Sequence, residues 1–368
     1  MSRTPRNARK DARKGRPKES ALTALPWLAL ACMALVWPTR AGPGVESQPA
    51  AVLARIEPGR GRSARWPLQI PWRGWRDILG RTWVSFNEDQ IMTRAGAVTF
   101  FGLLALFPAV SVFVSLYGVF ADVHDAEKQV VALASIAPHP AVVFLGEQML
   151  RVSKDHPPQV TPAFALGVVL AIWSANSGIM ALINALNAAY GEVEKRSWLR
   201  LTLHGLVFTV GALAFTLFTI GSIVAFPLLL PGVRRAAAWF DLLRWPALVV
   251  VGGVALSVIY RYGPSRAHAR WRWVTTGSAL VSLAWVGASV LFSWYVSTLG
   301  HYDRIYGPFA AAAGAMMWLW ISTVILLFGA ELNAQIEHQT AVDSTTGPPM
   351  PPGLRGAAVA DTVGEAKG

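Results

Sequence analysis

The chain has 368 residues, enough for one large domain or two small ones, but only 15% are charged and 53% are hydrophobic. Soluble domains carry about 25% charged residues, so this composition excludes an ordinary water-soluble fold. The net charge of +12 lies in the N-terminal tail and in short segments between apolar runs, a pattern typical of membrane topology rather than nucleic-acid binding. Cys32 is the single cysteine, which excludes an internal disulfide, and the seven histidines show no short metal-ligand spacing.

The first segment, residues 1–70, is basic and predicted to be largely disordered. It contains an apolar stretch at residues 21–37, close to the lower limit of about 17 residues for a membrane span. This stretch could be a seventh span, a signal sequence, or sequence translated from upstream of the true start. A span here would place the arginine-rich residues 38–93 outside the membrane, which the positive-inside rule opposes.

Residues 71–93 alternate aromatic and basic side chains and predict an amphipathic helix at the membrane surface. Residues 94–338 then form the predicted transmembrane domain, and the Pro/Gly-rich tail at 339–368 is predicted to be disordered. Backbone groups in lipid must be satisfied within their own segment, so each apolar run should be a helix. The predicted spans are residues 95–120, 161–182 with a helical extension to 190, 201–229, 243–260, 274–299 and 306–332.

The charges between these spans predict their orientation. Arginines precede the first span, and Lys/Arg clusters in 190–200 and 261–273 assign these segments to the cytoplasm. The acidic loop 121–160 and the nearly neutral loop 300–305 fall outside, whereas arginines in 231–244 lie on the outer side against the rule. The sequence therefore predicts an all-α polytopic membrane helix bundle with six transmembrane helices, N-in and C-in.

Polar side chains inside a span are costly, so each needs a physical reason. The densest set lies on the second span and its extension, where a helical repeat of about 100° per residue gathers it into one stripe. The stripe consists of Ser174, Asn176, Ser177, Asn184, Asn187 and Tyr190. It could line a solute path or join helices through hydrogen bonds worth about 0.6–2 kcal/mol each, and hydrogen bonding is the favoured interpretation. A break in the helix at Gly178 would favour the solute path.

The sixth span carries the remaining candidates, with Tyr306 at its start and Glu331 and Asn333 at its end. Glu331 is the one carboxylate that adjoins the apolar core of a predicted span. It could carry protons or pair with a cationic solute. The favoured interpretation is an ordinary interfacial acid that pairs with a loop arginine such as Arg261 or Arg272. No catalytic or metal-ligating residue is predicted.

Several stretches in order resemble the YihY/BrkB family, whose members were once labelled ribonuclease BN. The matching stretches are Ala95–Pro108, Trp173–Tyr190, Tyr260–Pro264 followed by Trp271–Trp273, and Tyr302–Asn333. The resemblance extends from about Trp72 to His338 and does not include residues 1–70. It implies a multi-pass protein of the bacterial cytoplasmic (inner) membrane with six spans and cytoplasmic termini. It implies no settled activity, because members are described as transporters or exporters and as virulence-associated proteins.

Three functions are considered. The first is a transporter or exporter of an unidentified solute or lipid, with the polar stripe as the path and Glu331 as a possible coupling residue. The second is a structural or assembly factor without transport activity, which docks other envelope proteins through residues 71–93 and the outer loop. The third, a ribonuclease, is disfavoured because metal-dependent RNA hydrolysis needs clustered carboxylates or histidines. The chain is thus expected to be no enzyme, to need no cofactor, and to contact the lipid bilayer and an unknown solute or lipid but no nucleic acid.

Overall fold

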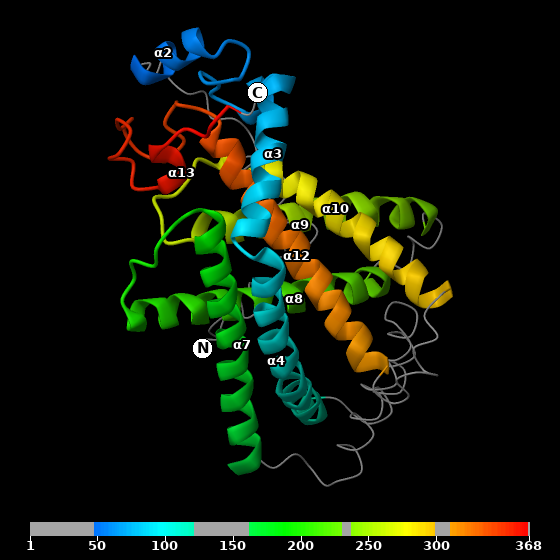
Figure 1. The fold of residues 1–368 in the computed structure, drawn as a ribbon. Coiled ribbons are helices and arrows are strands. Elements are labelled where there is room, and N and C mark those ends of the chain that lie inside the picture. The colour runs from blue at the N-terminus through cyan, green and yellow to red at the C-terminus, as the bar shows by residue number, and fades with distance from the viewer. Residues whose placement is uncertain (1–47, 121–161, 230–236, 299–309, 367–368) are drawn as a thin grey trace, which may run out of the picture. The chain divides into compact units, whose positions relative to one another are not determined.

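The computed structural model describes residues 48–120, 162–229, 237–298 and 310–366, and these residues are helical with connecting loops (Figure 1). The chain divides into two compact units, residues 1–43 and 44–368, and every described residue belongs to the second. The apolar stretch at 21–37 and Tyr306 therefore lie outside the described residues. The elements are α2 (Gln48–Ile56), η2 (Pro67–Gln69), α3 (Trp72–Glu88), α4 (Ile91–Phe120), α7 (Pro162–Ala189), α8 (Trp198–Leu229), α9 (Ala237–Tyr262), α10 (Trp271–Thr298), α12 (Ala310–His338) and α13 (Ala358–Asp361).

Each of the six predicted apolar segments is a helix, namely α4, α7, α8, α9, α10 and α12, which confirms the all-α class over the described residues. Within those residues, four stretches are long and apolar enough to cross a membrane. They are Ala165–Ala189, Trp198–Phe215, Trp271–Val296 and Ala312–His338. Shorter apolar stretches lie in α4 and α9, at Ile91–Ala105 and Val249–Tyr262. The number of six spans and the orientation of the ends stay predictions.

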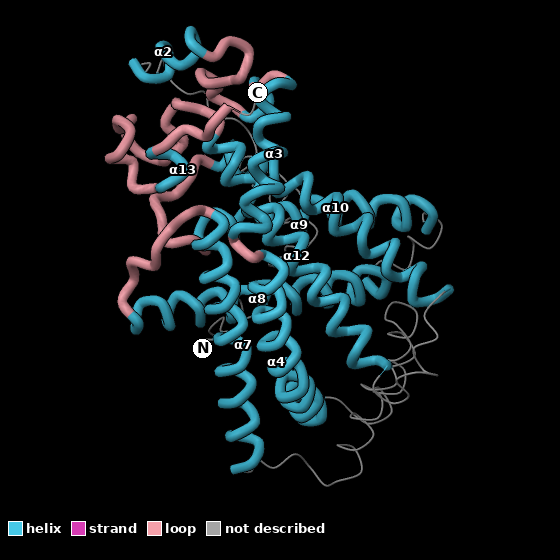
Figure 2. The backbone as a smooth tube through the Cα atoms, in the orientation of Figure 1, coloured by secondary structure: helices cyan, strands magenta, loops and turns pink. Residues whose placement is uncertain are grey.

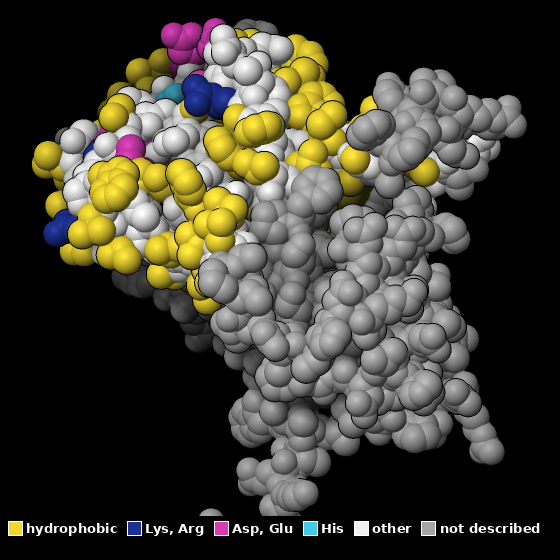
Figure 3. Space-filling model, turned by 90° about the horizontal axis from the view of Figure 1, so that it is seen from below, with side chains coloured by type: hydrophobic (Ala, Val, Ile, Leu, Met, Phe, Trp, Pro, Cys, Tyr) yellow, Lys and Arg dark blue, Asp and Glu magenta, His cyan; other side chains and the backbone are white. Residues whose placement is uncertain are grey.

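The long helices turn apolar side chains outward. Leu203, Val207 and Val210 of α8 are exposed, and so are Leu283 and Leu291 of α10. In the described part of the face shown in Figure 3, hydrophobic side chains are widespread and charged groups are few. Contiguous apolar surface of this kind is unfavourable in water but is matched by lipid. The outward faces are therefore those of helices that contact a bilayer.

Helix α12 lies at the centre of the packing, with contacts to α3, α4, α7, α10 and α13. Two glycines allow the close approach of its neighbours, because a side chain at either position would collide with the facing group. Gly277 of α10 faces the amide of Asn333, and Gly329 of α12 faces Val281 and the Tyr260 hydroxyl. Small residues at such crossings are typical of helix packing in membranes. The close packing places Asn333 directly against the backbone of α10.

Helix α3 is amphipathic, as the sequence predicts. Its buried face includes Asp77, Ile78 and Arg81 and packs against α12, while Trp72 and Trp83 are exposed on the other side. Helix α3 ends at Glu88, and only Asp89 and Gln90 separate it from α4. Its location at the membrane surface stays a prediction.

Two segments correct the predicted disorder. Residues 48–70 fold into α2, η2 and their connections, and residues 340–366 form a folded tail with Ala341, Ser344 and Arg355 buried. Figure 2 shows the loops of both segments near α2 and α13. The prediction fails because the polar composition of the tail hides its specific pairing with helix ends. Long-range hydrogen bonds supply the order that a hydrophobic core would otherwise provide.

Candidate functional site

Asn187, from the predicted polar stripe, joins two loops at one end of the bundle. Its Nδ2 donates to Glu194 Oε2 at 2.9 Å, and its Oδ1 accepts from the backbone N–H of Ser265 at 2.7 Å. Gly191, with φ of 62°, ends α7 in the left-handed conformation that favours glycine and turns the chain back toward Asn187. Asn187 is therefore a structural contact between two loops, rather than the contact between helices that the favoured interpretation of the stripe describes.

A buried ion pair lies beside Asn187. Arg266 Nη2 contacts both carboxylate oxygens of Glu337, at 2.9 and 2.5 Å, and each side chain is only 2% exposed. Ser344 donates a further hydrogen bond of 2.6 Å to Glu337. Burial alone would lower the pKa of Arg266, but the charge of Glu337 outweighs burial and raises it. The Arg266 guanidinium also lies 4.9 Å from the centre of the Tyr190 ring, so Tyr190 supports this pair.

Arg81 links α3 to α12 and to the tail. Its guanidinium donates to the side-chain oxygens of Gln335 at 2.9 Å and Gln339 at 2.5 Å, and to the backbone oxygen of Glu365 at 2.8 Å. Burial, together with the positive charge of Arg62, lowers the pKa of Arg81 to about 10. Arg81 therefore remains a cation at neutral pH, held by acceptors from two segments that are far apart in sequence.

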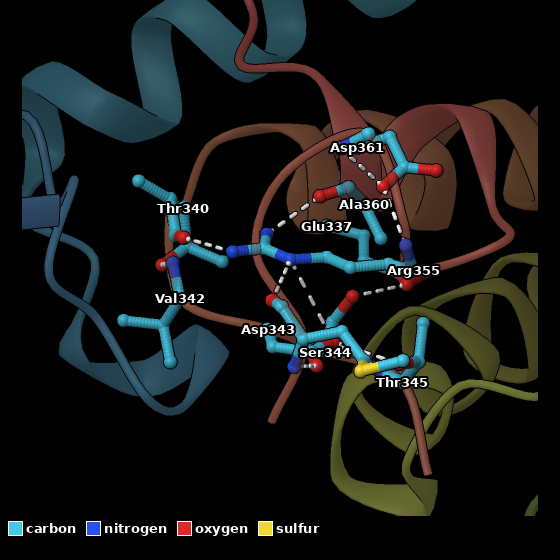
Figure 4. A network of polar contacts seen from close by, with 12 residues as sticks. Glu337, Thr340, Val342, Asp343, Ser344, Thr345, Arg355, Ala360 and Asp361 are labelled. Carbon is cyan, nitrogen blue, oxygen red and sulfur yellow. Dashed lines mark hydrogen bonds and ion pairs between the residues drawn. The ribbon is translucent and has the colours of Figure 1, made fainter. Parts of the chain in front are cut away.

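Arg355 organises the folded tail, as Figure 4 shows. Its guanidinium donates to three backbone oxygens, those of Met350 at 2.9 Å, Ala360 at 2.6 Å and Ala341 at 3.0 Å. The carboxylate of Asp343 lies 4.0 Å from Arg355 Nε. One buried cation thus closes the tail on itself and satisfies carbonyls that would otherwise be orphaned.

The tail also fastens the loops between the long helices. The backbone N–H of Ala358 donates to Glu192 at 2.7 Å, and that of Ala267 donates to Gly356 at 2.9 Å. The guanidinium of Arg62 donates to the backbone oxygens of Gln339 and Gly364. We name the whole set of paired groups the end network. It comprises Arg62, Arg81, Asn187, Glu192, Glu194, Arg266, Glu337 and Arg355 with their partners.

Several buried side chains have an atom without a hydrogen-bond partner, among them Arg266 Nη1 of the end network. Three of these side chains carry unpaired amide or carboxyl oxygens inside the long helices. They are Asn176 on α7 and Glu331 and Asn333 on α12. Asn176 Oδ1 faces α8, where it would lie 2.5 Å from a Cβ at Gly205. Asn333 faces α10, and Glu331 is 0% exposed with neither oxygen bonded. We name these three residues the unpaired set.

The pairing of Glu331 with Arg261 or Arg272, which the sequence favours, is not formed. Arg261 instead donates to the backbone oxygen of Ala269 and lies 4.6 Å from the centre of the Trp271 ring. The direction in which a side chain leaves a helix is set by tertiary packing, which charge counting alone does not reveal. Glu331 is therefore a buried acid rather than an interfacial one.

The other stripe residues do not join the unpaired set. Ser177 donates to the backbone oxygen of Trp173 one turn earlier at 2.9 Å, Ser174 is half-buried, and Asn184 is exposed. Helix α7 runs through Gly178 without the break that the sequence allows. The residues of the predicted stripe therefore lie in different surroundings on α7, and they do not line one path together.

The unpaired groups lie at three different helix contacts and hold no metal site. Within the described ranges, no three His, Cys, Asp or Glu side chains lie where they could bind a metal ion together. The residues of the end network that sequence reasoning missed are mostly arginines and their backbone acceptors. No local motif marks them, since their partners lie up to 302 positions away in the chain.

Long apolar helices with lipid-facing surfaces and buried polar groups between them define a multi-pass integral membrane protein. The sequence model of the family described as virulence factor BrkB matches residues 82–352, which is most of the chain. The chain belongs to this family, and the resemblance seen in the sequence is confirmed.

Several bacterial proteins are similar to the chain. The ribonuclease-like protein YfkH of Bacillus subtilis is 28% identical over 48% of the chain and 66% of its own length. The UPF0761 membrane protein NMB0524 of Neisseria meningitidis is 24% identical over 69% of the chain and 61% of its length. For the UPF0761 membrane protein MS0032 of Mannheimia succiniciproducens these values are 22%, 70% and 89%. The chain thus spans less than two thirds of the first two relatives, and no solved structure matches it.

Proposed function

We propose that the protein is a transporter or exporter of the bacterial cytoplasmic membrane, acting on a solute or lipid that is not yet identified. The observation that carries this proposal is Glu331, an acid that is fully buried in an apolar helix without a bonding partner. An unpaired polar group in such surroundings costs free energy, and an ionisable one in a membrane helix is a functional residue by default. Stability alone gives no reason to keep it.

Asn176 and Asn333 support the same conclusion. Both are amides with free hydrogen-bonding capacity, and each faces a glycine on the neighbouring helix. A relative shift of α7 against α8, or of α10 against α12, would expose these amides to a passing ligand. Alternating exposure of buried polar groups through movements of helix groups is how many membrane transporters work. The end network, in which Arg62, Arg81, Arg266 and Arg355 all bind acceptors, would hold the helix ends while such a shift occurs.

The test of transport uses purified protein in sealed liposomes with a panel of labelled metabolites and fluorescent lipids. We expect movement of at least one solute or lipid class above protein-free liposomes. Asn176→Leu should abolish this movement, while Asn184→Leu, an exposed position on the same helix, should leave it intact. Equal movement in liposomes with and without protein across the panel would contradict the proposal.

The assembly factor is the second candidate, favoured by one observation. Helix α3 exposes Trp72, Leu79 and Trp83, large apolar side chains on its outward face. Such a face could dock another membrane protein. If Trp72→Ser and Trp83→Ser abolish the cellular phenotype while Asn176→Leu and Glu331→Gln leave it unchanged, the assembly role replaces transport. The ribonuclease in the name of YfkH finds no comparable support among the described side chains of this chain.

A further inference from the structure

The folded tail pairs with the short segment that leads into α10. Ala269 of this segment and Thr345 of the tail form an antiparallel β-bridge. Backbone groups on both sides of the bridge complete the pairing, and we name their hydrogen bonds the latch. These bonds are Ala267 N–H to Gly356 O at 2.9 Å, Thr346 N–H to His268 O at 2.9 Å, Arg270 N–H to Ser344 O at 2.8 Å and Arg270 Nε to Thr345 O at 2.8 Å.

The latch joins the start of α10 to the end of α12. Helix α10 begins directly after the latched segment 267–270, and α12 ends at His338, a few residues before the latched part of the tail. Farther into the bundle, Gly277 of α10 faces the amide of Asn333 on α12. The latch therefore fixes the ends of two helices whose crossing encloses an unpaired amide.

The tail holds its side of the latch in shape by itself. The backbone N–H and the hydroxyl of Thr345 both donate to Asp343 Oδ1, at 2.9 and 2.7 Å (Figure 4). The other carboxylate oxygen of Asp343 accepts from Met350 N–H at 2.9 Å, and Arg355 closes the rest of the tail. All these partners lie within the tail. Segment 344–346 can therefore leave residues 267–270 and return without refolding.

Other contacts hold the tail in place without the latch. Arg62 donates to Gly364 O at 2.7 Å, and Arg81 of α3 donates to Glu365 O at 2.8 Å. Ala358 N–H donates to Glu192 in the loop between α7 and α8. None of these bonds involves residues 267–270, so the start of α10 can move while the tail remains bound to the rest of the molecule.

The latch and the neighbouring ion pair of Arg266 with Glu337 differ in their access to water. Both side chains of the ion pair are only 2% exposed, so separating the charges would leave them without solvent. His268 and Thr346 in the latch are exposed, and water can replace the bond between them. A short two-stranded pairing of this kind is marginally stable and opens before packed helices do. The ion pair is therefore a fixed point beside a contact that opens readily.

We propose that the latch is a gate: closed, it holds α10 against α12, and open, it lets the start of α10 turn about the Arg266–Glu337 pair. The proposal rests on the proposed transport function and deepens it, since it states where the shift that exposes Asn333 begins. The structure contains the closed latch, with Asn333 only 2% exposed. Opening exchanges backbone hydrogen bonds within the protein for bonds to water, so a ligand that binds the exposed amide selects the open state.

The first experiment measures the latch without a transported ligand. Asn333→Cys is introduced into the full-length Cys32→Ser protein in lipid nanodiscs, and its reaction with a water-soluble methanethiosulfonate reagent is timed. Thr346→Pro removes the N–H that donates to His268, whereas Thr346→Ala keeps it, and both variants lose the hydroxyl bond to His268 O. We expect the reaction to be at least about fivefold faster in Thr346→Pro than in Thr346→Ala, because an open latch admits water to the crossing of α10 and α12.

Equal rates in Thr346→Pro and Thr346→Ala would overturn the gate. Should Thr346→Pro fail to fold, a disulfide between Ala269→Cys and Thr345→Cys decides. Residues that face each other between such flanking bonds have Cα atoms about 4.5 Å apart, within the range of disulfides. Residues 274–281 of α10 should then exchange their amide hydrogens more slowly in the oxidised protein than in the reduced protein. Exchange that does not depend on the disulfide would overturn the gate.

The second experiment separates the gate from the transport function. Liposomes with the Ala269→Cys/Thr345→Cys protein in the Cys32→Ser background are assayed, oxidised and reduced, with the panel of labelled metabolites and fluorescent lipids. We expect flux to fall to the protein-free level on oxidation and to return on reduction, while the Cys32→Ser parent is indifferent to both treatments. No flux in any sample, with faster labelling of Asn333→Cys in Thr346→Pro, supports the gate and contradicts transport. Equal flux in the oxidised and reduced proteins supports transport and overturns the gate.

Discussion

Glu337 and Glu331 lie less than two turns apart on α12, yet their surroundings are opposite. Glu337 accepts hydrogen bonds from Arg266 and Ser344, whereas neither oxygen of Glu331 has a donor. One buried glutamate of α12 thus has hydrogen-bond donors for its carboxylate, in the end network, and the other has none, in the unpaired set. The comparison teaches that this fold can build partners for a buried acid where stability requires them. Their absence at Glu331 is the observation on which the proposed function rests.

The largest expected effect comes from breaking the end network at Arg266. Arg266→Met leaves Glu337 buried without its cation, and loss of one partner of a buried ion pair costs about 3–5 kcal/mol. Chemical denaturation in detergent, followed by circular dichroism, measures this loss of unfolding free energy. The double variant Arg266→Met/Glu337→Leu should regain much of the loss.

Lys195→Met is the comparison variant, because the Lys195 side chain is 59% exposed, against 2% for Arg266, although its partner Glu192 is only 3% exposed. A lysine that reaches solvent should contribute about 1 kcal/mol or less to such a pair. Equal losses of unfolding free energy in Arg266→Met and Lys195→Met would contradict the claim that the buried ion pair of the end network stabilises the fold.

A smaller loss is expected at the tail. Arg355→Met removes three guanidinium hydrogen bonds to backbone oxygens, and hydrogen bonds of charged groups contribute about 1.5–3 kcal/mol. The tail after Gln339 should then open and become sensitive to limited proteolysis, while the helices remain protected. Arg73→Met, on the exposed side of α3, serves as the control. A tail as resistant in Arg355→Met as in wild type would contradict its anchoring by this residue.

Apolar substitution in the unpaired set, in contrast, should not lower the unfolding free energy. Asn176→Leu replaces a buried amide that lacks a partner for its oxygen by an apolar side chain of similar size, so the unfolding free energy should stay within about 1 kcal/mol or rise. Asn187→Leu removes two hydrogen bonds from loop groups and should lower it by about 1–3 kcal/mol. Both variants lie on α7, so they compare an unpaired asparagine with a paired one on the same helix. Equal losses of unfolding free energy at both positions would contradict this difference.

The smallest effect concerns acid stability. Burial alone would raise the pKa of Glu194, but hydrogen bonds from Arg196, Asn187 and Ser265 and the charge of Arg196 outweigh it and lower the pKa. A carboxyl with a lowered folded-state pKa stabilises the fold above its ordinary value of 4.5 and loses that contribution as the pH falls further. The melting temperatures of wild type and Glu194→Gln should therefore differ at neutral pH and converge below about pH 4.5. A constant difference across the titration would contradict this assignment.

The long helices could be predicted from sequence because an apolar run of sufficient length admits one backbone solution in lipid. The loop contacts of Asn187 did not follow from the sequence, because hydrogen bonds between helices were the favoured interpretation of the stripe. The folded tail could not be predicted, because its low hydropathy resembles that of a disordered segment while its order depends on Arg62 and Arg355. Such partners become visible only when distant segments are brought together.

The candidate site was predicted in part. Asn176, Glu331 and Asn333 were identified from their cost in an apolar helix, but the expected arginine partner of Glu331 was wrong.

The most direct test of the account is a paired measurement on Glu331→Leu, of unfolding free energy in detergent and of flux in liposomes. The account predicts that the unfolding free energy is unchanged or higher than in wild type, while flux falls to the protein-free level. A loss of several kcal/mol would show that Glu331 has a stabilising partner, and full flux would show that the buried acid is not needed for transport. Either result would contradict the claim that the unpaired set is kept for function.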